Sequence, residues 1–596
     1  MNRRSFTARS IVLVMAFMGG LTVAPSARAE CKVTAVATLP VTMVGGQPKV
    51  AAKVNPADAT FAIYTGQPFS FITPASAAEF GLRLSPLPSG TVREGRRSTN
   101  ASAAVVKTFT LAGAAIPRVG FIVAASEGGN DGGGFIGEDF LGQFDAEYDL
   151  ANGVIRLWDA QGCGASALAY WDKAGAYSVM DIEARDVDAS VGAWKTITGK
   201  AFVNGAAIRV KFATETPVSF LWRDAAQSTG IDLSGKSVTA IGYTQGADGR
   251  RAASWIVPVA TFKIGQEEIR QTHLRVSNDT RVTPNIPGMF LGADFFLSHR
   301  IYVANSQHKL YFTYNGGPVF DLTATPAATP QASRTDARPP PIDADGYARR
   351  GAASAARGEF GPAIADLTQA ITLAPTESRY RYERAVIYGA NSQRSPMMVD
   401  LDKTLELKPD DVSALLFRAK YRLADHDTAG ATADLNAVDT AAPSEADARL
   451  ILADLYETAD ALPRAVAEYD LWIKAHPADN KRGQALKGRC WVRALLGEGL
   501  DLALNDCDAA LRADPKDIYV LDNRGLVLLR QGAFDKAIAD YDAVLAQNPK
   551  AAWALYCRGL AKLHKGLTTE GNADIAVATA LQPGFPAKAK AHGIGP

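Results

Sequence analysis

The stretch FIGEDFL at residues 135–141 decides the fold of the first half of the chain, because it returns as FLGADFF at residues 290–296. Each copy follows, at a comparable distance, an apolar segment that contains a threonine: AIYTG at residues 62–66 and VKFATET at residues 210–216. Each copy is also followed by two short apolar runs with turn residues between them, a pattern typical of paired β-strands. The first half is therefore predicted to contain two copies of one β unit.

Composition changes twice along the 596 residues. Up to about residue 320, short alternating apolar runs broken by Gly, Pro, Asn and Asp predict two all-β lobes, at residues 31–163 and 164–320. Residues 321–343 are rich in Pro, Ala and Thr and predict a semi-extended linker. From residue 344 to residue 596, Ala, Leu and Asp recur at helical spacing. The predicted fold class is therefore multidomain, with an all-β module followed by an all-α region.

The repeated β unit resembles the bacterial retropepsin-like aspartic proteases, in which an active-site strand ends in Asp-Thr/Ser-Gly and a hydrophobic-hydrophobic-Gly-x-Asp-Phe-Leu segment follows. The resemblance covers both lobes and implies a pepsin-like module in which each lobe supplies one aspartate. Two such carboxyl groups share one proton, because adjacent carboxylates cannot both ionise, and they activate a water molecule. The resemblance also implies that Gly137 and Gly292 support the active site, because the backbone there passes close behind the loops.

Neither expected aspartate is present. Tyr64 and Ala213 occupy the two positions, and Glu215 replaces the second glycine. The rest of the pattern is retained as Thr65, Gly66 and Thr214. A phenol is neutral at physiological pH, and alanine has no proton to transfer. Because losing one member of a catalytic unit leaves little activity, this departure predicts a pseudoenzyme without catalytic residues.

Three other acidic side chains are alternative candidates for a catalytic role. Glu215 is either a lone carboxylate in the cleft or, as we expect, a solvated residue of a reshaped loop. Asp139 and Asp294 recur symmetrically, but acidic residues favour the first turn of a helix, and we expect that role for both. The seven histidines are scattered and no Cys-x-x-Cys occurs, so neither a metal nor a cofactor is predicted.

Prolines mark a regular period in the second half of the chain. They fall 34 residues apart and resume that spacing after one longer step, at Pro375, Pro409, Pro443, Pro477, Pro515, Pro549 and Pro583. The region resembles tetratricopeptide repeats (TPR), which have this period and a terminal proline, and we expect about seven of them. The resemblance implies a superhelix whose concave face binds a protein or peptide. Trp491, Tyr519, Trp553 and Tyr556 either line such a groove or, as we expect, fill the core.

The N-terminus predicts export. Residues 1–29 combine early arginines, a short apolar run and an Ala-Arg-Ala cleavage site, as in a signal peptide. We expect a periplasmic or secreted product, by either the general secretory or the twin-arginine route. Because cysteines tend to pair in such compartments, Cys31 with Cys163, and Cys490 with Cys507, are each either a disulfide or two buried thiols. We expect Cys557 to be a buried thiol.

Charge and hydropathy exclude some partners. The 63 Lys and Arg residues balance 62 Asp and Glu residues, so no basic excess indicates nucleic acid, and no stretch beyond the signal indicates stable membrane insertion. The sequence predicts an exported binding or scaffolding protein that holds peptides or proteins on the TPR concave face and in the cleft between the lobes. Two alternatives remain open: an active aspartic endopeptidase whose array recruits substrate, and a β module that is purely architectural.

Overall fold

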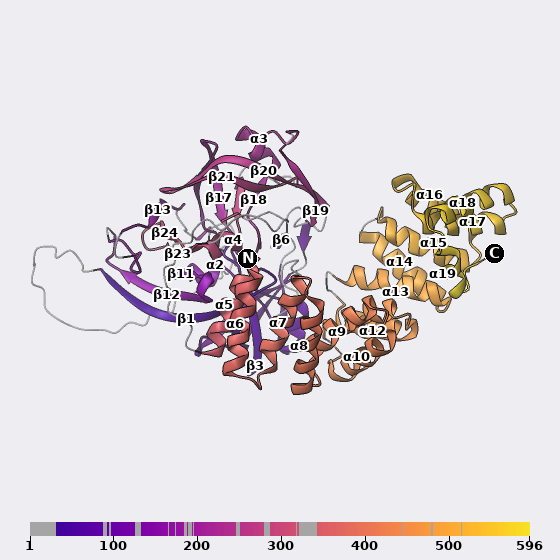
Figure 1. Ribbon diagram of the computed structural model, residues 1–596, viewed down its shortest axis with the longest axis horizontal. Helices are drawn as coiled ribbons and strands as arrows, with labels where there is room; N and C mark the ends of the chain where they lie inside the picture. Colours follow the sequence, from indigo (N-terminus) through magenta and orange to yellow (C-terminus); the bar gives the residue numbers. More distant parts are fainter. Residues whose placement is uncertain are drawn as a thin grey trace, which may run out of the picture.

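The computed structural model describes most of the chain, as a β-rich part followed by a helical array (Figure 1). The described residues are 31–87, 92–94, 97–99, 101–124, 133–164, 166–172, 175–183, 187–188, 193–194, 196–235, 237–245, 251–278, 287–316, 319–320, 343–444, 446–477, 479, 481–513 and 515–595. The predicted signal peptide and nearly all of the predicted linker lie outside them. Within the described ranges, no helix is long and apolar enough to cross a membrane.

The first lobe is built from strands that place one face on a core. In β2 (Gln47–Val54) every second residue from Pro48 onward is buried, as expected when successive side chains point to opposite faces. The other elements of this lobe are β1 (Lys32–Val44), β3 (Ala57–Ile63), β4 (Phe71–Ile72), α1 (Pro74–Glu79), β5 (Leu84–Pro86), β6 (Val92–Glu94), β7 (Arg97–Thr99), β8 (Ser102–Leu111), β9 (Ala114–Val123), β10 (Gly134–Ile136), α2 (Glu138–Leu141), β11 (Asp145–Asp149), the short 3-10 helix η1 (Leu150–Asn152) and β12 (Val154–Gln161).

The second lobe contains the same kinds of element in nearly the same order. They are β13 (Ser178–Asp181), β14 (Val187–Asp188), β15 (Ala193–Trp194), β16 (Thr198–Val203), β17 (Ala206–Phe212), β18 (Phe220–Trp222), α3 (Arg223–Ser228), β19 (Thr239–Gln245), β20 (Arg251–Ile264), β21 (Glu267–Ser277), β22 (Met289–Leu291), α4 (Ala293–Ser298), β23 (His299–Ala304) and β24 (Lys309–Tyr314).

Strand pairing shows that the two lobes are copies of one unit. In the first lobe, β10 runs parallel to β3 and antiparallel to β4, and β4 runs parallel to β9. In the second, β22 runs parallel to β17 and antiparallel to β18, and β18 runs parallel to β21. The two repeated sequence segments therefore begin on equivalent central strands, as the duplication predicted.

A shared sheet joins the lobes. Strand β11 pairs antiparallel with β23, with Ala146 opposite Val303 and Tyr148 opposite Ile301, and β12 and β24 extend the sheet on either side. All five residues of β11 are buried, so both faces of this strand are covered. One continuous hydrophobic cluster includes side chains from both lobes. The lobes are therefore held in a fixed relation around their junction.

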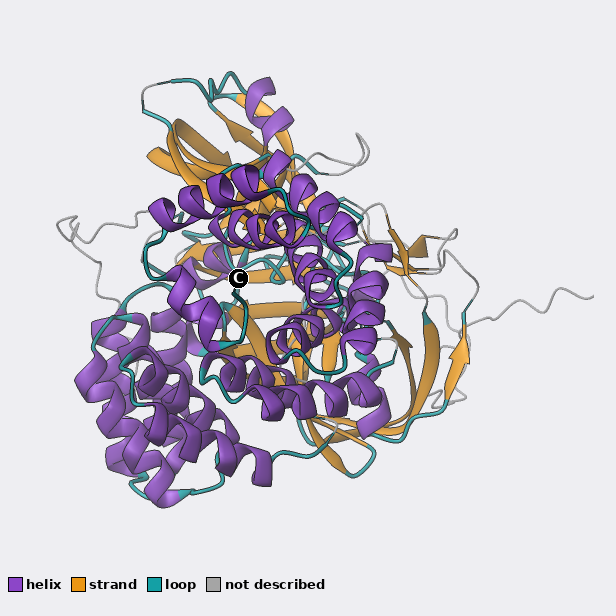
Figure 2. Ribbon diagram, turned by 90° about the vertical axis from the view of Figure 1, so that its right-hand side faces the viewer, coloured by secondary structure: helices purple, strands orange, loops and turns teal. Residues whose placement is uncertain are grey.

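The helical part consists, over the described residues from 343 onward, of seven helix pairs and one further helix. The pairs are α5 (Ala344–Ala356) with α6 (Phe360–Leu373), α7 (Ser378–Ala390) with α8 (Arg394–Leu407), α9 (Val412–Ala424) with α10 (Thr428–Ala441), α11 (Ala448–Thr458) with α12 (Leu462–Ala475), α13 (Arg482–Leu496) with α14 (Leu500–Ala513), α15 (Ile518–Arg530) with α16 (Phe534–Gln547), and α17 (Ala552–His564) with α18 (Thr568–Leu581). The last helix is α19 (Phe585–Ala591). Figure 2 views the curved array from its far end.

An arginine–aspartate ladder fastens the helix pairs. In six of the seven pairs, an arginine of the first helix makes a two-pronged hydrogen bond with an aspartate of the second. The pairs are Arg350–Asp366, Arg384–Asp400, Arg418–Asp434, Arg489–Asp506, Arg524–Asp540 and Arg558–Asp574. In the fourth pair, Arg449 contacts Glu468 instead. Because the aspartates are mostly buried, each arginine satisfies a carboxylate that would be costly to leave unpaired.

The first repeat is attached to the β module. Helix α5 packs against β1 and η1, and Ala353 of α5 is fully buried in the hydrophobic cluster of the lobes. Gly153 has a φ of 65°, and a Cβ there would lie 2.7 Å from the Cβ of Arg349. The close approach requires a residue without a side chain. The array is therefore anchored at one end, a contact that the sequence did not predict.

Candidate functional site at the lobe junction and in the array

Two loops with equivalent hydrogen bonds meet where the lobes join. The N–H of Tyr64 donates to Ile136 O over 3.0 Å, and the N–H of Ala213 donates to Leu291 O over 2.8 Å. Three and four residues farther on, the carbonyls of both loops accept backbone hydrogen bonds from the two residues that follow the repeated glycine. The two threonine-containing loops therefore occupy matching places in the two lobes.

A reciprocal pair of threonines joins the two loops. The hydroxyl of Thr65 accepts from the N–H of Thr214 over 3.1 Å and donates to Phe212 O over 3.0 Å. The hydroxyl of Thr214 accepts from the N–H of Thr65 over 3.1 Å and donates to Ile63 O. Both side chains are fully buried. The retained threonines thus hold the loops together across the junction.

A serine–aspartate bracket supports each loop from behind. The carboxylate of Asp139 accepts from the N–H and hydroxyl of Ser70, and that hydroxyl accepts from the N–H of Gly137 over 3.0 Å. Asp294, Ser219 and Gly292 repeat the arrangement in the second lobe. Burial raises the pKa of Asp139 and raises that of Asp294 to about 6. Both aspartates lie in the first turn of a helix, as expected, and each also accepts hydrogen bonds from a serine of the neighbouring loop.

The two glycines lie where a side chain would collide with backbone. A Cβ on Gly137 would lie 2.4 Å from Phe69 O, and a Cβ on Gly292 would lie 2.6 Å from Thr216 O. Neither distance leaves room for a carbon atom, and the obstacle is backbone, which cannot swing away. These contacts are of the kind expected for both positions.

The residues at the expected aspartate positions contribute no acid group. Tyr64 is 1% exposed, and its ring stacks on Phe135 at a centroid distance of 4.6 Å. Burial, followed by the nearby Glu215, raises the pKa of the Tyr64 phenol. Ala213 is fully buried. The pair therefore fills the junction with an aromatic ring and a methyl group.

Glu215 brings the carboxylate that is closest to these positions. Its side chain is 14% exposed and lies across the junction, where it accepts from the N–H of Gly66 over 3.0 Å and sits 3.9 Å from Lys211 Nζ. Burial raises the pKa of Glu215, while Lys211 opposes the shift, and burial lowers the pKa of Lys211. The expectation of a solvated Glu215 is wrong, because the second loop turns this side chain toward Gly66, which has no side chain to exclude it.

The junction offers a single carboxylate held by a lysine and a backbone N–H. A shared-proton mechanism needs two carboxyl groups in contact, and no second one touches Glu215 among the described residues. The described residues also include no cluster of three or more potential metal ligands. What the arrangement offers chemically is a buried ion pair beside aromatic rings.

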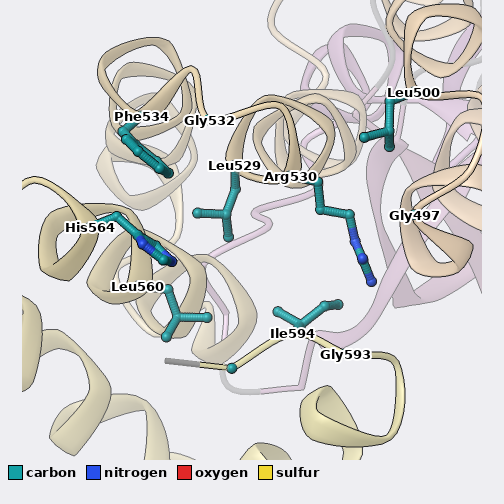
Figure 3. Close-up of a pocket in the computed structure, with 11 residues that line it drawn as sticks. Gly497, Leu500, Leu529, Arg530, Gly532, Phe534, Leu560, His564, Gly593 and Ile594 are labelled. Carbon is teal, nitrogen blue, oxygen red and sulfur yellow. The ribbon is translucent and has the colours of Figure 1, made fainter.

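The last helix of the array folds back onto earlier repeats. Phe585 at the start of α19 contacts the rings of Trp553 and Tyr556, and Trp553 contacts Trp491. Beside this segment lies a cavity of about 350 Å³ between the fifth, sixth and seventh repeats (Figure 3). Its lining includes Leu500, Phe534, His564 and Ile594, and Arg530 reaches toward Ile594. Tyr519, which the sequence placed in the core, is 59% exposed.

The cysteines pair as two disulfides. Cys31 is bonded to Cys163, which ties β1 to the end of β12, and Cys490 of α13 is bonded to Cys507 of α14. Cys557 is a buried free thiol, and burial raises its pKa. For each of these two pairs, the sequence allowed either a disulfide or two buried thiols, and the structure contains the disulfide.

Comparisons with known proteins concern the helical part. The family described as TPR repeat matches residues 525–566, which include α16, α17 and the second half of α15. A TPR protein from Parabacteroides merdae is 14% identical over 42% of this chain and 98% of its own, with a TM-score of 0.32. YrrB, described as a TPR protein with an unusual peptide-binding site, is 19% identical over 38% of this chain and 97% of its own (TM-score 0.22). MamA is 21% identical over 29% of this chain and 96% of its own (TM-score 0.23). The search of curated proteins gave no match.

The C-terminal region is a helical, TPR-like repeat array of seven helix pairs over the described residues, within which residues 525–566 match the TPR repeat family. Sequence reasoning missed three groups of residues around the candidate sites: the serines Ser70 and Ser219, the junction lysine Lys211, and the tail after α18. The serines left a signal, since each stands at the same offset after Tyr64 or Ala213. Lys211 and the tail left none, because their partners are distant in sequence.

Proposed function

We propose that this chain is an exported protein-binding scaffold whose β module is a retropepsin-like unit without proteolytic activity. One observation carries the proposal: the Thr65–Thr214 pair keeps the two loops in register while Tyr64 and Ala213 stand where a shared-proton mechanism needs carboxyl groups. The duplicated strand pairing and the paired glycine contacts support the retropepsin-like assignment. The two disulfides support an oxidising compartment, and hence export.

The binding role comes from the array. TPR repeats generally present an inner surface to protein or peptide partners, and a stacked array supplies such a surface over several repeats. The anchoring of α5 on the β module fixes the array at one end, so that a bound partner is held at a defined place relative to the lobes. The surface where the lobes meet is a second candidate, because strand-like main-chain pairing needs no catalytic acid.

The position of Glu215 supports a second candidate function, that of an endopeptidase. Glu215 places one carboxylate at the junction, and a lone carboxylate can act as a general base on water. An endopeptidase that recruits substrate through the array would use this residue. Its bond to Gly66 and its proximity to Lys211 favour a structural role, because both interactions occupy the carboxylate.

Restoring the missing groups tests the assignment. The variant with Tyr64→Asp, Ala213→Asp and Glu215→Gly rebuilds the family pattern on this scaffold. We expect pepstatin-sensitive cleavage of an unfolded protein at acidic pH from this variant and none from the parent. A folded variant without activity would remove the support for the retropepsin-like assignment.

The scaffolding role has its own test. The full chain and a chain that ends after the first repeat, at residue 376, are used to capture partners from a periplasmic extract. A partner retained by the full chain and lost by the short one places binding in the array. Equal capture by both would move the function to the β module.

A further inference from the structure

The tail, residues 583–595, does not extend the stack of helix pairs. In the rest of the array, each second helix packs along the first helix of the next repeat, as α16 does with α17. Helix α19 follows α18 in sequence but is only seven residues long, and it makes less contact with α18 than α17 makes with α16. A terminal helix that only capped the array would lie along α18. The tail turns back instead, and its destination is the first helices of earlier repeats.

Phe585, the first residue of α19, packs on aromatic side chains of α17. Phe585 is 7% exposed, and its ring lies 4.7 Å from that of Trp553 and 5.7 Å from that of Tyr556, both in edge-to-face geometry. Trp553 in turn contacts Trp491, two repeats away, at 5.2 Å. Buried aromatic side chains of this kind carry much of the binding energy in protein interfaces.

The rest of the tail crosses three further first helices. Ala589 and Ile594 are buried. Arg530, at the end of α15, donates to the carbonyls of His592 and Leu495, and so bridges the tail to α13. The imidazole of His592 lies 3.7 Å from Asp460, in the turn after α11. The tail is therefore linked to all four repeats from the fourth to the seventh. Residues of α15, α17 and the turn after α11 contact it directly, and α13 is linked to it through Arg530.

Charge is complementary along this path. Lys588 of the tail interacts electrostatically with Glu457 near the end of α11, and His592 faces Asp460. Gly593, Ile594 and Gly595 line one side of the cavity beside the tail (Figure 3). Removing the tail would therefore open the cavity on that side. The covered surface is thus an aromatic pocket with an acidic rim and an adjoining hollow.

We propose that the tail is an intramolecular ligand that occupies the inner surface of repeats four to seven, and that the partner of this surface is a short peptide helix of the same chemistry. Such a peptide has an aromatic residue for the Trp553–Tyr556 pocket, basic residues three and seven positions later, and an apolar residue that replaces Ile594. The partner must displace the tail, so access to the groove is limited by the tail's own occupancy. This inference rests on the proposed binding role of the array.

Binding of a labelled peptide tests the proposal. The probe is a synthetic peptide with the sequence of residues 583–596. The protein is the full chain with a protease site inserted in the exposed turn at Gln582–Gly584, so that the tail can be cut after folding. The cut, dialysed chain should bind the probe at least about tenfold more tightly than the uncut chain. A full chain with Phe585→Ser should behave like the cut chain.

Matched variants locate the binding site. In the cut chain, Trp553→Ala should weaken binding at least about tenfold, whereas Tyr519→Ala, an exposed aromatic of α15, should leave it unchanged. Equal affinity of the cut and uncut chains would overturn the inference, as would absence of binding to a cut chain whose circular dichroism is intact. Either failure leaves the scaffolding role standing, because that role is tested separately by capture with the full chain.

Discussion

Replacing Thr65 by Val should destabilise the β module by about 2–6 kcal/mol. The substitution keeps the shape of the side chain and removes one hydroxyl, which leaves the carbonyl of Phe212 and the N–H of Thr214 without their partners in a fully buried site. Each unsatisfied buried group costs roughly 1–3 kcal/mol. The loss is a large share of the total, because folded domains are stable by only about 5–15 kcal/mol.

Urea unfolding followed by hydrogen-exchange mass spectrometry is the appropriate assay. Peptides from β3 and β17 then report the β module separately from the array, which is necessary because a multidomain chain does not unfold in one step. Thr60→Val is the matched control, since Thr60 is an exposed residue of β3, the strand that leads into the Thr65 loop. That change should alter the free energy of unfolding by less than about 0.5 kcal/mol.

A double-mutant cycle with Thr214→Val isolates the reciprocal pair. Each hydroxyl bonds to the other residue's N–H, so the two substitutions remove shared interactions and should couple by about 0.5–3 kcal/mol. Equal stability of the Thr65→Val and Thr60→Val chains, or strictly additive effects in the cycle, would refute the reasoning that the threonines hold the loops together.

Three further predictions concern the rest of the molecule. Because burial raises the pKa of Asp294 from its ordinary 3.8 to about 6, its contribution to stability is full below the unfolded pKa and falls as pH rises toward 6. The variant Asp294→Asn should flatten that part of the stability curve in acid titrations. In the array, Arg524→Leu leaves the buried Asp540 unpaired and should cost about 3–5 kcal/mol in urea unfolding, whereas Lys565→Met, which breaks an exposed pair, should cost about 0–1 kcal/mol. Replacing Cys490 and Cys507 by Ala should lower the free energy of unfolding by about 3 kcal/mol, because the bond closes a short loop. A reducing agent should lower the melting temperature of the array in the parent but not in the variant, whereas the β module, which keeps Cys31–Cys163, should respond equally in both.

Much of the fold could be predicted because its signals are local and repeated. The FIGEDFL segment requires a glycine at a close backbone approach and an aspartate in a helix first turn, and both requirements recur in each lobe. The 34-residue period likewise reflects one helix pair repeated along the array. The arginines and aspartates of the ladder follow the same period, so that signal was present in the sequence as well.

The candidate sites depended on contacts that sequence does not encode locally. Glu215 bonds to Gly66, which is 149 residues away, and whether a loop glutamate meets solvent or a distant N–H is decided by how the lobes join. The tail was equally hidden. Pro583 marks the end of a repeat, and the residues after it continue the period in sequence while leaving the stack in space.

The array and the lobes are linked by packing. Ala353 is buried in the core of the β module, a contact that the predicted semi-extended linker at residues 321–343 did not indicate. A partner held by the array therefore has a defined position relative to the lobe junction, which is what a scaffold requires.

Proteolysis by the purified full chain tests the central claim most directly. An unfolded protein substrate is incubated with the chain at acidic pH, with and without pepstatin, beside the variant Glu215→Gln. Because Tyr64 and Ala213 provide no carboxyl group and Glu215 is bound to Gly66, we predict cleavage no faster than in buffer for both chains. Pepstatin-sensitive turnover by the parent that disappears in Glu215→Gln would contradict the account.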